Sequence, residues 1–82
     1  DMIMVKPGLP YLDVLARLKK EFKVPTLVYQ VSGEYSMLVS LANKDLNILE
    51  NVVMESMICF KRSGADAIIT YFAMEISGWI NR

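Results

Sequence analysis

The fold of this chain is decided by the stretch Met2-Ile3-Met4-Val5-Lys6-Pro7-Gly8. Its first four residues are apolar and suit a buried strand, and the Pro-Gly pair after Lys6 breaks the strand. The strand therefore ends in a lysine. A lysine buried at such an end can lose its proton, and the neutral amine can attack a carbonyl. The alternative is an ordinary solvated lysine beside a turn.

The rest of the chain alternates helical and strand patterns. Apolar residues recur at helical spacing over residues 11–22, with Pro10 in the first turn, and β-branched and aromatic residues fill residues 26–31. Ser32-Gly33 is expected to break that second strand. The remaining predicted elements are helices over 34–42, 48–62 and 73–80 and a strand over 67–71. We expect Asn47 to cap the long helix and Gly64 to end it.

This order of elements is βαβαβα, which predicts an α/β protein with a parallel sheet covered on at least one face. The segments that begin at Asp1 and Asp66 resemble each other, since each has an acid, an apolar strand and a polar group at its end. Matching units are expected in a (β/α)₈ barrel, which needs about 250 residues. Residues 1–82 would form about three of its units without an internal domain boundary. A small standalone α/β sheet is the alternative.

Composition limits the classes of function. Hydrophobic residues make up 54% of the 82 residues, which suggests apolar surface that expects neighbours outside this chain. The formal net charge is zero, which argues against binding to nucleic acid or a membrane surface through bulk charge. The chain has no histidine and one cysteine, Cys59, so a disulfide framework and a cysteine-cluster metal site are excluded within it. We expect Cys59 to be a small buried hydrophobe. No signal peptide is visible, and the start inside a strand suggests a fragment.

Polar side chains stand at the ends of all three predicted strands. Lys6 ends the first strand, Ser32 follows the second and Tyr71 ends the third. The carboxyl ends of parallel strands face the active site in α/β folds. An amine there could form an imine with a ketone, while two hydroxyls hold a carboxylate. A turn serine and a core tyrosine are the plainer interpretations of Ser32 and Tyr71.

The amino-acid sequences of several segments, along essentially the whole chain, resemble those of the porphobilinogen synthase (δ-aminolevulinic acid dehydratase) family. The matching segments are Met4-Val5-Lys6-Pro7-Gly8-Leu9-Pro10-Tyr11-Leu12-Asp13, Tyr29-Gln30-Val31-Ser32-Gly33-Glu34-Tyr35, Glu55-Ser56, Phe60-Lys61-Arg62-Ser63-Gly64-Ala65-Asp66 and Ile69-Thr70-Tyr71-Phe72-Ala73. They keep the order and spacing of the family.

The resemblance implies roles for particular residues. Lys6 would form a Schiff base with 5-aminolevulinate, Ser32 and Tyr71 would bind that substrate's carboxylate, and Tyr29 would line the same pocket. The family joins two molecules of 5-aminolevulinate into porphobilinogen with loss of water. The fold it implies is the carboxyl-terminal part of a TIM barrel, in a cytoplasmic enzyme assembled as a homo-octamer.

The resemblance also implies that parts of the machinery lie outside these residues. The family's second active-site lysine and its ligands for zinc or magnesium would lie upstream, so no cofactor is expected on this chain and the chain alone is expected to be inactive. Two alternatives remain. One is another imine-forming barrel, such as a class I aldolase, and the other is a non-catalytic fragment that associates through exposed strand edges.

Overall fold

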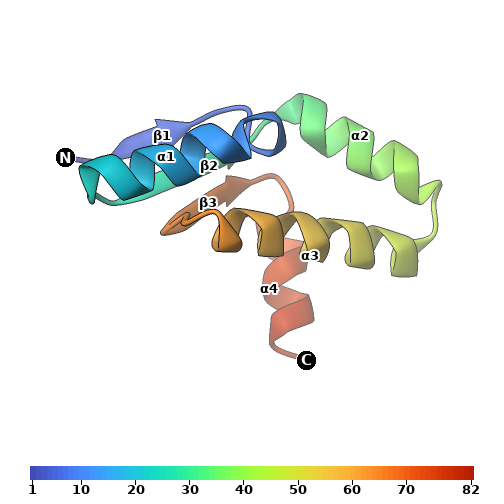
Figure 1. The fold of residues 1–82 in the computed structure, drawn as a ribbon. Helices are drawn as coiled ribbons and strands as arrows, with labels where there is room; N and C mark the ends of the chain where they lie inside the picture. The colour runs from blue at the N-terminus through green and yellow to red at the C-terminus, as the bar shows by residue number, and fades with distance from the viewer.

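The structure, a computed structural model, describes all residues, 1–82. Strands and helices alternate along the chain, as the sequence predicts (Figure 1). The elements are β1 (Ile3–Val5), the 3₁₀-helix η1 (Leu9–Tyr11), α1 (Leu12–Phe22), β2 (Thr26–Gln30), α2 (Ser32–Ala42), α3 (Leu46–Arg62), β3 (Ala67–Thr70) and α4 (Ala73–Ile80). The predicted βαβαβα order is therefore confirmed, including the two helices predicted between β2 and β3.

The strands form one parallel sheet in the order β1-β2-β3. The register places Val5 beside Val28, and Val28 beside Ile68. Because side chains alternate across a strand, these three residues share one face of the sheet. Helices α1 and α3 pack on that face, and β1 and β3 remain open edges.

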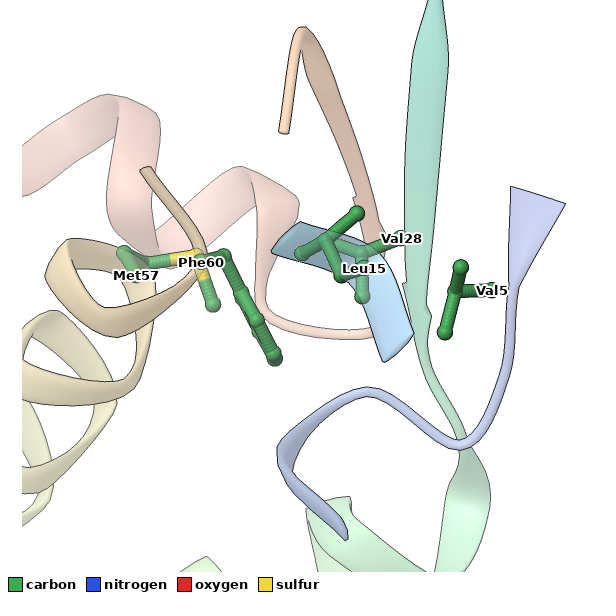
Figure 2. Packing of buried hydrophobic residues seen from close by; sticks show 5 residues of the cluster. All are labelled: Val5, Leu15, Val28, Met57 and Phe60. Carbon is green, nitrogen blue, oxygen red and sulfur yellow. The ribbon is translucent and has the colours of Figure 1, made fainter. Parts of the chain in front are cut away.

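The main core lies between this face and the two helices (Figure 2). Leu15 from α1 and Phe60 and Met57 from α3 meet Val5 and Val28 of the sheet. Burying a side chain of this size contributes about 1.5–3 kcal/mol. Leu15 and Phe60 lie on the apolar faces of their helices, and those faces are the ones that pack on the sheet.

An ionic contact ties α1 to the amino-terminal ends of β2 and β3. The amine of Lys19 lies 2.6 Å from the Asp66 carboxylate, which also accepts the backbone N–H of Thr26 at 2.8 Å. The hydrogen bond from Lys19, followed by that from Thr26, lowers the pKa of Asp66. This contact lies at the end of the sheet opposite Lys6.

The boundaries of two helices differ from the sequence predictions. Helix α3 begins at Leu46, and its cap is Asp45, whose carboxylate accepts the N–H groups of Asn47 at 2.9 Å and Ile48 at 3.2 Å. The prediction of Asn47 as the cap is wrong because Asn47 already lies in the first helical turn. Strand β2 ends before Ser32-Gly33, as expected, but helix α2 begins at Ser32, two residues earlier than predicted.

The predicted end of α3 at Gly64 is confirmed. Gly64 has φ +105°, a conformation that side chains disfavour. Its N–H donates to the carbonyl of Lys61, and the N–H of Ala65 donates to the carbonyl of Phe60, each at 3.1 Å. This is the Schellman pattern, which turns the chain from α3 into β3.

The structure leaves much apolar surface uncovered. Met74 is 84% exposed, Leu46 77% and Met2 70%. The molecule measures 40 × 25 × 17 Å, and its short dimension fits a single sheet with one layer of helices. No helix is both long enough and apolar enough to cross a membrane.

Candidate active site

Parallel strand order brings the predicted site residues to one edge of the sheet. Lys6 directly follows β1, Tyr29 is the penultimate residue of β2, and Tyr71 directly follows β3. Ser32 begins α2, two residues beyond the end of β2. We call this edge, with Lys6, Tyr29, Ser32 and Tyr71, the carboxyl rim.

Alternation along the strands places Lys6, Tyr29 and Tyr71 on the face of the sheet that the helices do not cover. Val5 is buried against the helices, so its neighbour Lys6 falls on the opposite face. Tyr29 is paired with Ile69, two residues before Tyr71, and these residues share that same open face. Strand alternation thus places one amine and two phenols on the same face of the sheet.

The phenols of Tyr29 and Tyr71 are joined directly. Their hydroxyl oxygens lie 3.2 Å apart, within hydrogen-bond distance, and their ring centroids are 6.4 Å apart. The hydrogen bond with Tyr71, aided by partial desolvation, raises the pKa of Tyr29. Tyr35 packs edge-on against Tyr71 with ring centroids 5.7 Å apart. These contacts orient the Tyr71 side chain, whose hydroxyl can donate to an anion.

Ser32 is an exposed residue in the first turn of α2. The amino-terminal end of a helix carries partial positive charge, which favours a carboxylate. A serine hydroxyl in that position can donate to the same carboxylate. Ser32 and Tyr71 are therefore chemically suited to the acid group of a ligand whose ketone reaches Lys6.

Lys6 itself is exposed in this chain, contrary to the burial expected from its strand. The side chain stands on the open face of the sheet, where these residues alone provide no cover. The salt bridges of the chain involve other residues, so the Lys6 amine forms no ion pair with a carboxylate. The amine is free to meet a ligand. Cys59 is half-buried rather than buried as expected.

Sequence reasoning missed the role of Glu34. Its side chain is only 2% exposed, and its carboxylate accepts three backbone N–H groups: Gly8 at 3.0 Å, Leu9 at 2.6 Å and Val31 at 2.8 Å. A glutamate in the third position of a helix is a known capping signal. The bonds to Gly8 and Leu9 could not be found that way, since they join residues far apart in the sequence.

A buried polar network below the rim was also missed. Gln30 donates to the Ser56 hydroxyl at 3.0 Å and accepts from the Thr70 hydroxyl at 2.7 Å. Thr70 in turn accepts the N–H of Phe72 at 3.1 Å. The network fixes the ends of β2 and β3 to α3, and it sets where the chain turns at Tyr71.

One cavity of the chain lies away from the rim. It is a groove of about 750 Å³ between α3, β3 and α4, lined mainly by apolar side chains such as Met54, Ile58 and Ile76. None of the rim residues lines it. The chain also holds no cluster of three or more His, Cys, Asp or Glu residues that could bind a metal ion. The residues present therefore do not fit the zinc or magnesium that the resemblance implies, and we derive no step through a metal.

Known proteins match this chain over nearly its whole length. The family model for delta-aminolevulinic acid dehydratase matches residues 1–79. The delta-aminolevulinic acid dehydratase of Bradyrhizobium diazoefficiens is 52% identical over 73 residues, which cover 89% of this chain and 21% of that protein. The chloroplastic enzyme of Chlamydomonas reinhardtii is 46% identical over 80 residues, covering 98% of this chain and 20% of the relative.

A solved structure shares the fold. It is the crystal structure of delta-aminolevulinic acid dehydratase (porphobilinogen synthase) from Toxoplasma gondii ME49 in complex with the reaction product porphobilinogen. The TM-score is 0.90 at 51% identity, over 96% of this chain and 22% of that one. The chain thus spans about a fifth of the length of these relatives. Because the family model matches residues 1–79 of this chain, the chain belongs to the delta-aminolevulinic acid dehydratase family.

Proposed function

We propose that this chain supplies one substrate site of a porphobilinogen synthase, which condenses two molecules of 5-aminolevulinate. The observation that supports the proposal is the carboxyl rim, where Lys6 directly follows β1 and the hydroxyls of Tyr29 and Tyr71 lie 3.2 Å apart. The choice of 5-aminolevulinate as the substrate follows from membership of the family. A ketone acid of this kind needs a nucleophile for its carbonyl and donors for its acid group, and the rim offers both.

The first step is imine formation at Lys6. The neutral amine attacks the ketone carbon, the carbonyl oxygen takes up a proton, and the resulting carbinolamine loses water to leave a C=N bond. Ser32 and Tyr71 hold the carboxylate of the same molecule by hydrogen bonds. Tyr29 keeps Tyr71 in place through the bond between their hydroxyls. The substrate is thereby fixed at both ends, which reduces the entropic cost of reaction.

The proposal assigns the remaining parts to residues outside this chain. Residues 1–82 form about three of the units of a TIM barrel, and the second lysine lies on another strand. Zinc or magnesium, where the whole enzyme uses it, binds elsewhere. We propose the homo-octamer of the family as the assembly and the cytoplasm as the location. The 82 residues alone form no porphobilinogen.

Grafting tests the proposal. Residues 1–79 replace the matching segment of the Bradyrhizobium relative, and the chimera is assayed for porphobilinogen. We expect turnover, and we expect Lys6→Arg to lower it by about a thousandfold or more, since a guanidinium cannot form the imine. Lys61→Arg, an exposed lysine on α3, is the matched control and should keep the activity. An assembled chimera that is inactive, or active with Lys6→Arg, refutes the proposal.

A further inference from the structure

Glu34 connects the two segments that carry the ends of the proposed substrate site. Its carboxylate accepts the N–H groups of Gly8 and Leu9, which lie two and three residues after Lys6. The same carboxylate accepts the N–H of Val31, directly before Ser32. One side chain therefore bridges the loop after β1 and the start of α2.

The bridge is unlike an ordinary helix cap. A cap needs only a local partner such as Val31, and an exposed glutamate can provide it. Glu34 is 2% exposed, and a buried carboxylate is costly unless hydrogen bonds compensate for its lost hydration. Two of its three bonds go to the loop after Lys6, 25 and 26 residues away. The buried carboxylate of Glu34 therefore depends on its hydrogen bonds to that loop, and the loop is held by the same bonds.

The loop has little other anchorage of this kind near Lys6. Gly8 lies against the ring of Phe60, where the packing leaves no room for a side chain. This contact fixes the depth of the loop over the core. It does not fix the loop relative to α2, since Phe60 belongs to α3. Glu34 provides the connection to α2.

We propose that Glu34 is a positioning residue that sets the placement of the Lys6 amine relative to the Ser32 hydroxyl. The inference rests on the proposed function, in which these two residues hold the ketone and the carboxylate of one molecule. A displacement of about 1 Å between such groups can cost about a hundredfold in rate. Glu34 does not contact the substrate. It acts through the backbone of the loop after Lys6 and of the residue before Ser32.

The test compares two ligands on the chimera that carries residues 1–79 in the Bradyrhizobium relative. One is 5-aminolevulinate, and the other is aminoacetone, which has the amino ketone without the carboxylate. Each is trapped with borohydride, and the reduced adduct on the Lys6 peptide is quantified by mass spectrometry, with the Lys61 peptide as the measure of unspecific labelling. Thermal unfolding of every variant is recorded alongside.

Two variants and a control separate placement from folding. Glu34→Gln removes the charge and one acceptor, and Glu34→Asp shortens the side chain so that it can reach Val31 but not the loop as well. We expect both to lower the preference of Lys6 for 5-aminolevulinate over aminoacetone by about tenfold, the scale of charge-assisted hydrogen bonds. Labelling by aminoacetone should persist. Glu75→Gln, an exposed glutamate of α4 without a partner, should keep the preference.

The outcomes distinguish this inference from the proposed function. A chimera with unchanged Glu34 that shows no preference for 5-aminolevulinate at Lys6 contradicts the proposed function itself. A wild-type preference that survives in both Glu34 variants overturns the positioning role alone. Unfolding of both variants also overturns it, because Glu34 would then serve the stability of the fold rather than the geometry of the rim.

Discussion

Gly8→Ala should destabilise the chain although its backbone accepts alanine. Gly8 has φ −72° and ψ −68°, which any residue adopts. A Cβ atom there would lie 2.6 and 2.7 Å from two ring carbons of Phe60 and 2.9 Å from a methyl carbon of Val28. Contacts this short require a shift, and both neighbours are fully buried and cannot move into solvent.

The size of the effect follows from two opposing terms. Overpacking of a filled core costs about 1–3 kcal/mol. Alanine restricts the unfolded chain more than glycine does, which returns about 0.4–1 kcal/mol. The midpoints of the two terms give a net loss of about 1.3 kcal/mol, which for a domain of this size lowers Tm by roughly 5–10 °C.

Thermal unfolding at one fixed protein concentration measures this, because association would otherwise shift Tm. Gly78→Ala is the matched control. Gly78 lies inside α4, and no atom beyond its chain neighbours and the backbone of its own helix lies within 4 Å of the position that an alanine Cβ would take there. Alanine at this position should therefore raise stability by about 0.5–1 kcal/mol through helix propensity. A Gly8→Ala chain that melts at or above the wild-type temperature would refute the packing described for the loop after Lys6.

Three further outcomes are expected. Ser56→Ala leaves the buried amide of Gln30 without its acceptor and should lower the free energy of unfolding in urea by about 1–3 kcal/mol. Ser36→Ala, at an exposed position, should leave it unchanged, and a Ser56→Ala chain as stable as the wild type would contradict the network. The raised pKa of Tyr29 means that its bond to Tyr71 stabilises the fold below the ordinary tyrosine value of about 10 and is lost as pH rises through the raised pKa. Tyr71→Phe should return the Tyr29 titration, followed by NMR of ring-labelled tyrosine, toward the ordinary value, and an unchanged titration would contradict the pair. The open edges and exposed apolar residues predict concentration-dependent association, and light scattering that shows a monomer at all concentrations would count against it.

Local patterns in the sequence predicted the elements well. The apolar run before Lys6, the helical spacing of Leu15 and the glycine at position 64 each depend on neighbours in the chain, so sequence reasoning could find them. Capping of α3 was harder. Asp45 and Asn47 are both good cap residues, and the choice depends on the left-handed turn at Asn43 and Lys44 that precedes them.

The site could be predicted only in part. The ends of parallel strands meet at one edge, so the placement of Lys6 and Tyr71 followed from the pattern of strands. The bridge from Glu34 to Gly8 and the network around Gln30 depend on contacts between distant residues. No periodicity reveals such contacts. The exposure of Lys6 was also beyond prediction, because it depends on how many units cover the open face of the sheet.

The imine at Lys6 is the central claim, and borohydride trapping tests it most directly. The chimera that carries residues 1–79 in the Bradyrhizobium relative is incubated with 5-aminolevulinate, reduced, digested and mapped by mass spectrometry. We predict a reduced adduct on the peptide that contains Lys6, which Lys6→Arg removes and Lys61→Arg leaves in place. Labelling that spares the Lys6 peptide while the chimera still makes porphobilinogen would contradict the account.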